Sequence, residues 1–189
     1  AAPELVDVAA SVSFAEDLVN ATPQLIDAAV KLTDTDSASF NGGQLVVSVI
    51  SGYGSIEQAQ LPQNPELQDQ FGIRNVGSGV GQVGVSGSVA GSVVSYQGTA
   101  IGTIVSDGAS GRDLIITFNA SATAQAVEAV IENLTYRNTV SNPVETRTVS
   151  IQVSDGAGGA SAPQVIQIEV VPEYDGGEAL FDEEVVNTY

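Results

Sequence analysis

Two segments near opposite ends of the chain share one residue pattern. Residues 14–21 (FAEDLVNA) and 181–188 (FDEEVVNT) each contain an aromatic residue, a variable residue, two acids, two aliphatic residues, Asn and a small residue. The offset is 167 residues throughout, and a Pro-Glu pair precedes each copy. Similarity at a fixed spacing is typical of tandem repeats, which restricts the chain to a modular architecture.

The length and the apolar content indicate one core. The chain has 189 residues, of which 43% are hydrophobic, enough for one sizeable domain. We therefore predict one repeat over residues 1–171, followed by a linker and the first strand of the next repeat over 172–189. The incomplete second copy and the missing initiator Met predict that the sequence belongs to a longer chain.

Most of the sequence has the pattern of short β-strands. Residues 146–153 (TRTVSIQV) and 164–171 (QVIQIEVV) alternate in polarity, and the glycine-rich segment 154–159 predicts a hairpin loop between them. Further strands are expected at 6–14, 25–32, 44–51, 92–97, 99–105 and 113–119. The Gly- and Pro-rich stretch 52–87 predicts a long loop with at most a weak strand around Phe71.

One helix is predicted. Between residues 126 and 134 apolar side chains recur at helical spacing, and Ser121 or Thr123 can cap the start of this segment. Many short strands with a single short helix inserted predict an all-β protein, an antiparallel β-sandwich.

Charge and residue usage exclude several classes of function. Five basic residues against 23 acidic ones give a net charge of −18, which would repel nucleic acids and anionic membranes. The chain contains no Cys or His, so disulfides, thiolate sites and Ser-His or Cys-His catalysis are excluded within it. No apolar run approaches the roughly 20 residues of a membrane span.

A formal dinucleotide-binding motif, Gly79-x-Gly81-x-x-Gly84, lacks the context that its mechanism needs. That mechanism requires a helix whose N-terminus meets the pyrophosphate, and Val83, Val85 and Gly87 are poor helix formers. We do not expect nucleotide binding.

The acidic residues have two alternative roles, as calcium ligands or as structural residues of turns and strand edges. Asp34 and Asp36, one residue apart in a predicted turn, can point the same way and provide oxygen ligands for calcium, or they can simply cap the turn. Asp155 and Asp107 each precede Gly, as in ordinary turns. The acidic pair Glu16-Asp17 recurs as Glu183-Glu184, so the repeated segment preserves two acids that could have a functional role. The competing interpretation is that they belong to a solvated strand edge that resists aggregation.

Taken in order along residues 3–171, these segments resemble the cadherin-like, or chondroitin-sulfate-proteoglycan-like, repeats of large bacterial surface proteins and adhesins. The segments that carry the resemblance are 14–17 (FAED), 34–37 (DTDS), 71–75 (FGIRN), 81–87 (GQVGVSG), 134–139 (LTYRNT) and 149–156 (VSIQVSDG).

The resemblance implies a Greek-key sandwich (cadherin- or immunoglobulin-like) and an extracellular, cell-surface location. It also implies a calcium site, whose ligands match Asp34, Asp36, Asn41 and Asp155, with Glu16 from the first strand and Asp175 from the linker. The linker lacks the Asn-rich pattern of animal cadherins.

The leading hypothesis is a non-enzymatic, calcium-binding structural and adhesive module, with neighbouring repeats as its main partners. Surface glycans, other surface proteins and self-association are further expected partners. The alternative is a carbohydrate-binding module, in which Tyr53, Tyr96 and Tyr136 would line a sugar-binding surface or would instead pack locally. A two-carboxylate glycosidase is the enzymatic alternative.

Overall fold

The computed structural model describes residues 1–51, 69–139, 143 and 145–173. The strands in this part of the chain are β1 (Glu4–Val6), β2 (Ser11–Ala15), β3 (Gln24–Leu25), β4 (Lys31–Thr33), β5 (Gln44–Ser51), β6 (Asp69–Ile73), β7 (Val83–Val85), β8 (Val93–Tyr96), β9 (Thr99–Asp107), β10 (Leu114–Phe118), β11 (Leu134–Asn138), β12 (Thr146–Val153) and β13 (Gln164–Val171). The helices are α1 (Glu16–Ala21) and α2 (Ala124–Glu132).

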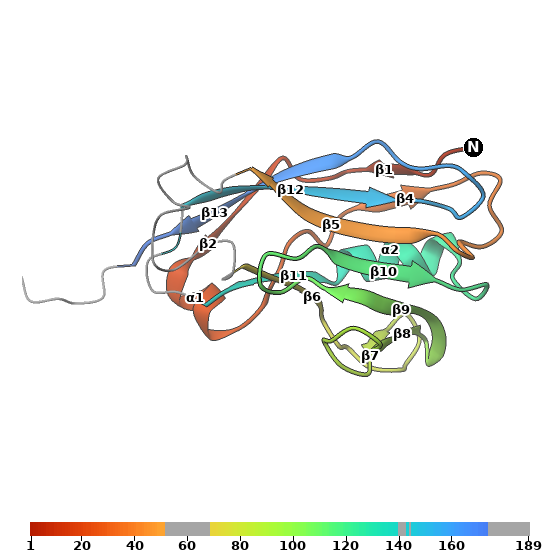
Figure 1. Ribbon diagram of the computed structural model, residues 1–189, viewed down its shortest axis with the longest axis horizontal. Helices are drawn as coiled ribbons and strands as arrows, with labels where there is room; N and C mark the ends of the chain where they lie inside the picture. The colour runs from red at the N-terminus through yellow and green to blue at the C-terminus, as the bar shows by residue number, and fades with distance from the viewer. Residues whose placement is uncertain (52–68, 140–142, 144, 174–189) are drawn as a thin grey trace, which may run out of the picture.

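One layer of the molecule is a large mixed sheet with the strand order β2-β13-β12-β5-β10-β9-β8-β7 (Figure 1). Residues 154–163, which include the predicted loop segment 154–159, join β12 to β13, and the two strands pair antiparallel from Thr146–Glu169 to Ile151–Gln164. The edge strand β2, however, runs parallel to β13. The expectation of a purely antiparallel arrangement is therefore wrong at this edge.

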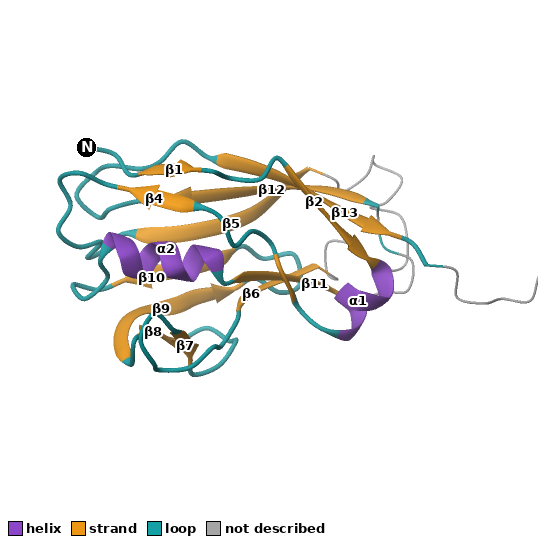
Figure 2. Cartoon of the chain, turned by 180° about the vertical axis from the view of Figure 1, so that it is seen from behind, coloured by secondary structure: helices purple, strands orange, loops and turns teal. Residues whose placement is uncertain are grey.

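The second layer covers one face of the large sheet. It consists of the β1-β4 pair, helix α2 and the small sheet β3-β11-β6, and Figure 2 shows α2 in front of β5 and β10. The core between the layers is built from alternate residues of the long strands, such as Leu45, Val47, Ile151 and Ile166, all of them buried. The chain is therefore an all-β protein of sandwich type, as its alternating patterns predicted.

Helix α2 begins where its sequence pattern predicts, and it ends at Glu132, so Leu134 belongs to β11. The Thr123 hydroxyl accepts a hydrogen bond from the Ala126 amide at 3.2 Å, which caps the first turn. Ala126, Val127, Val130 and Ile131 form its buried face. Lys31 on β4 bonds to the Glu128 and Glu132 carboxylates, which ties the exposed face of α2 to the neighbouring strand.

The N-terminal stretch departs from the predicted single strand over 6–14. Asp7 has a φ of 57°, a left-handed conformation, and the chain changes here from the β1-β4 pair to the large sheet. Directly after β2, the residues from Glu16 form α1, a second helix that we did not predict. Two acids in its first turn favour it, and Thr22 before Pro23 ends it.

Two further stretches differ from expectation. The predicted strand 25–32 is only β3 and the start of β4, separated by an irregular connection around Asp27, whose carboxylate accepts from the Ala9 and Ala29 amides. Within the predicted loop 52–87, the weak strand allowed for around Phe71 is present as β6, whereas β7 was not predicted, and residues 52–68 lie outside the described part of the chain. Among the described residues, no helix is long and apolar enough to cross a membrane.

Candidate functional site

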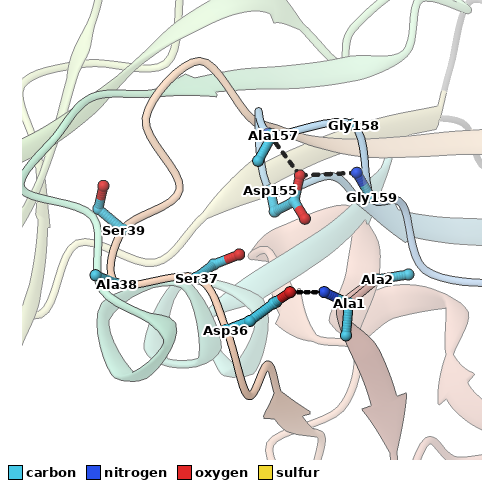
Figure 3. A pocket seen from close by; sticks show the side chains of 10 residues that line it. All are labelled: Ala1, Ala2, Asp36, Ser37, Ala38, Ser39, Asp155, Ala157, Gly158 and Gly159. Carbon is cyan, nitrogen blue, oxygen red and sulfur yellow. Dashed lines mark hydrogen bonds and ion pairs between the residues drawn. The ribbon is translucent and has the colours of Figure 1, made fainter.

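A cavity of about 620 Å³ lies at the end of the sandwich that carries the N-terminus (Figure 3). Two predicted site residues, Asp36 and Asp155, lie on it although they are far apart in the sequence. Asp36 belongs to the loop after β4, whereas Asp155 belongs to the β12-β13 loop. The other lining residues are Ala1, Ala2, Ser37, Ala38, Ser39, Ala157, Gly158 and Gly159.

Asp155 organises the loop that forms one wall of the cavity. Its carboxylate Oδ1 accepts hydrogen bonds from the Ala157 amide at 2.7 Å and the Gly159 amide at 2.9 Å. The side chain is only 3% exposed, so these bonds compensate for its burial. A Cβ atom at Gly159 would collide with Asp155 Oδ2 and the Ala1 carbonyl, which explains why glycine occupies this position. The predicted turn role of Asp155 is thus present.

Asp36 is more accessible. Its Oδ2 atom is ion-paired with the amino group of Ala1, and both side chains are more than half exposed. An exposed ion pair of this kind contributes at most about 1 kcal/mol to stability. The Asp36 carboxylate is therefore held in place by the N-terminus without being buried there.

Asp34 does not line the cavity. Its Oδ1 atom accepts from the amides of Asp36 and Ser37, both at 3.2 Å, which is the turn-capping arrangement. Its Oδ2 atom is buried and has no hydrogen-bond partner among the described residues. A buried carboxylate oxygen without a donor is unfavourable, so this atom has unused capacity for a cation.

Asn41 approaches the same loop through its backbone. It lies in an exposed turn, and a side chain at Gly156 would collide with the Asn41 carbonyl. A Cβ atom at Gly43 would likewise collide with the Ser154 carbonyl. The turn at 41–43 therefore packs against the β12-β13 loop, but the Asn41 side chain does not line the cavity.

Glu16 lies at the opposite end of the molecule, at the start of α1 (Figure 1). Its side chain is buried, and its Oε2 atom accepts from the Glu173 amide at 3.3 Å, just beyond the end of β13. The expectation that it belongs to the first strand is wrong, since β2 ends at Ala15. Its neighbour Asp17 is exposed. Asp175 lies outside the described residues.

The candidate ligands fit calcium only in part. Calcium takes six to eight oxygens, and carboxylates and backbone carbonyls are its preferred ligands. Asp36 and Asp155 place two carboxylates on one cavity. Within the described ranges, however, no three acidic side chains come close enough to form a metal site. Such an ion would need carbonyl, hydroxyl or water oxygens, or oxygens from a neighbouring module.

The described tyrosines of the predicted sugar-binding surface do not form a common surface patch. Tyr136 is fully buried, and its ring contacts Phe14 and Phe71 with centroid distances of 6.2 and 5.8 Å. Tyr96 is half-buried on β8, and Tyr53 lies outside the described residues. Tyr136 is therefore a core residue and not part of a sugar-binding surface.

Two other motifs behave as the sequence indicated. Asp107 is tied to Arg112 by two hydrogen bonds of 3.0 Å, and Gly108 has a φ of 68°, so this Asp-Gly pair forms a turn. Gly79 and Gly81 belong to a turn before β7, and no helix follows them. The dinucleotide-binding interpretation has no structural support at this position.

Sequence reasoning missed the contribution of the chain's first residues to the cavity. Ala1 and Ala2 reach it because β1 runs beside β4, and no local pattern marks that pairing. The glycines at 158 and 159 were an available signal, since a loop that approaches another backbone closely needs residues without side chains.

Comparison with known proteins found no family model, no curated protein and no solved structure that matches this chain.

Proposed function

We propose that this chain is a non-enzymatic, calcium-binding structural and adhesive repeat module of a large extracellular surface protein, with a cadherin-like Greek-key strand order. One observation carries the proposal. In the repeated segment, the three positions whose side chains the first copy buries are all identical in the second copy.

The match can be followed along the segment. Phe14, Glu16 and Val19 are at most 9% exposed, and the Asn20 Oδ1 atom is buried. These four residues recur unchanged in the second copy, as Phe181, Glu183, Val186 and Asn187. The exposed positions 17, 18 and 21 and the half-buried position 15 have changed in identity. Selection for packing explains this pattern, so the second copy carries what it needs to pack into a second module.

The shape of the molecule suits an end-to-end array. Figure 1 places the N-terminus at one end of the sandwich and the end of β13 at the other. Successive modules would therefore bring the Glu16 end of one module toward the Asp36 end of the next. Both ends carry carboxylates, which repel each other unless a cation lies between them.

Calcium would supply that positive charge. At the N-terminal end Asp36 and Asp155 would hold the ion, and the unpaired Asp34 Oδ2 atom offers a further oxygen nearby in the sequence. In a longer chain the Ala1 nitrogen would be an amide and not an ammonium group. The Asp36 carboxylate would then lose its ion-pair partner and would be free to bind the cation.

The test is thermal unfolding of the chain with and without calcium. Extracellular sites of this class bind at roughly 10⁻³ M, so about 10 mM calcium should stabilise the folded state by about 1.4 kcal/mol. For a chain of this length that corresponds to a rise in midpoint of about 3 to 6 °C. Magnesium at the same concentration should have a smaller effect, since it demands a stricter geometry.

Asp36→Asn should remove most of the calcium effect, whereas Asp113→Asn, at an exposed position away from the cavity, should retain it. If calcium and magnesium raise the midpoint equally, or if Asp36→Asn responds like the unmodified chain, the acids only cap turns and the calcium proposal fails.

A further inference from the structure

The outer face of the large sheet is not covered by the second layer, and it is almost free of charge. We call the outward side chains of β5, β10, β12 and β13 the neutral face. Every one of them is Gln, Ser, Thr, Val or Ile, except Glu169. Figure 1 looks onto this side, and α2 lies behind it, whereas Figure 2 shows the covered side. No described helix or strand packs on it.

The lack of charge is notable in so acidic a molecule. The chain carries 23 acidic residues, yet these four central strands place one carboxylate on this side. Two copies that approach through an acidic surface, such as the exposed side of α2 with Glu128 and Glu132, bring carboxylates against carboxylates. Residues 70–106 also lack acids, and the control variant described below lies in that part of the sheet. Two copies that approach through the neutral face bring hydroxyl, amide and aliphatic groups together, so repulsion is small in this orientation.

The chemistry of the neutral face also suits a second copy of itself. Around a two-fold axis the same surface forms both sides of the interface, and groups near the axis meet their own copies, so groups that can both donate and accept hydrogen bonds suit it. Ser and Thr hydroxyls and Gln amides do both, whereas carboxylates only accept. The cross-strand row Ser48–Ser150–Val165, and the neighbouring pair Val46–Gln152, mix such groups with apolar ones.

We propose that the neutral face is the interface of a weak, two-fold symmetric dimer of this chain. The proposal does not depend on calcium binding or on the tandem arrangement. Three strands of eight residues and one of five, about 4.8 Å apart and with a rise of about 3.3 Å per residue, cover roughly 450 Å². About 900 Å² would be buried in total, which is below the standard size of stable interfaces, so the dimer forms only at high concentration.

Sedimentation equilibrium of the chain tests this inference, with protein concentrations up to the millimolar range and about 0.5 M NaCl to shorten the screening length to about 4 Å. We expect a reversible monomer–dimer equilibrium. Ser150→Glu, at the centre of the neutral face, should abolish dimerisation because it buries two like charges near the axis. Glu169→Gln should strengthen dimerisation by removing the one carboxylate.

Thr99→Glu is the matched control, since it adds the same charge to an exposed strand position of the same sheet outside the neutral face. It should dimerise as the unmodified chain does. A monomer at every concentration, or equal loss of the dimer in Ser150→Glu and Thr99→Glu, would overturn the proposal. The dimer proposal would also fail if the chain stays monomeric and binds neutral polysaccharides, and if Ser150→Glu abolishes that binding.

A second readout does not depend on whether the charged variant folds. The chain has no Cys, so a single introduced thiol is unambiguous. Ser150→Cys should form a disulfide-linked dimer under mild oxidation faster than Thr99→Cys, because only the first lies near the two-fold axis. Equal rates for the two variants would contradict the proposed interface.

Discussion

Arg147 lies at the centre of a buried polar cluster that joins the two layers. Its Nε atom lies 2.6 Å from both carboxylate oxygens of Asp69, and the two side chains are 2% and 4% exposed. Tyr136 and Asn138 also donate to Asp69, at 2.7 and 2.9 Å, and the guanidinium lies 5.4 Å from the Tyr136 ring centroid. Burial, followed by the negative charge of Asp69, raises the pKa of the Tyr136 hydroxyl, so it stays protonated as a donor.

Removing Asp69 should therefore be costly. Asp69→Ala removes the buried carboxylate that accepts from Arg147, Tyr136 and Asn138, and we expect a loss of about 3 to 5 kcal/mol in the free energy of unfolding. Denaturant titration measures this difference. Asp107→Ala breaks a more exposed carboxylate–arginine pair and should cost less than about 1 kcal/mol. Equal losses in the two variants would show that the buried cluster does not hold the layers together.

At the scale of elements, β2 and α1 close one end of the sandwich. Phe14 stacks on Tyr136, and β2 pairs with the last strand β13 from Ser11–Gln167 to Ala15–Val171. Val19 on α1 is fully buried. These two elements thus connect the beginning of the chain to β13, and their sequence pattern recurs at residues 181–188.

The identical and the varied positions of this element should differ in energetic importance. Phe14→Ala removes a buried aromatic side chain, and we expect a loss of about 3 to 5 kcal/mol. Leu18→Ala, at a position that differs between the copies and is 47% exposed, should cost less than about 1 kcal/mol. Unfolding midpoints in urea compare the two. A larger loss for Leu18→Ala would remove the basis of the module proposal.

For the whole molecule, net charge dominates the electrostatics. With 23 acids and five basic residues, the compact state concentrates negative charge, and few acids have a cationic partner. Self-repulsion of this kind destabilises a folded chain and is reduced by salt.

Raising NaCl from about 0.01 M to about 0.5 M should therefore raise the thermal midpoint, because the screening length falls from about 30 Å to about 4 Å. Circular dichroism during heating measures it. This response should persist in Asp36→Asn, which separates general screening from specific calcium binding. A midpoint that falls with salt would mean that attractive ion pairs outweigh repulsion.

The long strands and the main helix were predictable because their signals are local. Alternation in 146–153 and 164–171 and the cap at Thr123 depend on neighbours in the sequence, and the structure contains these elements. Even the buried Arg147 has such a signal, since it is in phase with the inward residues Val149, Ile151 and Val153. The turn roles of Asp34 and Asp155 were likewise foreseeable, and their proposed calcium role stays a prediction.

Long-range pairings were not predictable. The parallel contact of β2 with β13 and the burial of Glu16 in α1 depend on residues more than 150 positions away. The cavity was not predictable either, because Ala1, Asp36 and Asp155 come from the N-terminus and from two separate loops.

The sequence alone determined the β class, the repeat and the negative charge of this protein, because periodicity, repetition and composition are properties of the chain itself. Only the tertiary structure decided which acids share a cavity, which face remains neutral and which repeated residues are buried. These properties depend on which strands become neighbours, and that choice is made by packing of the whole core and not by any local segment.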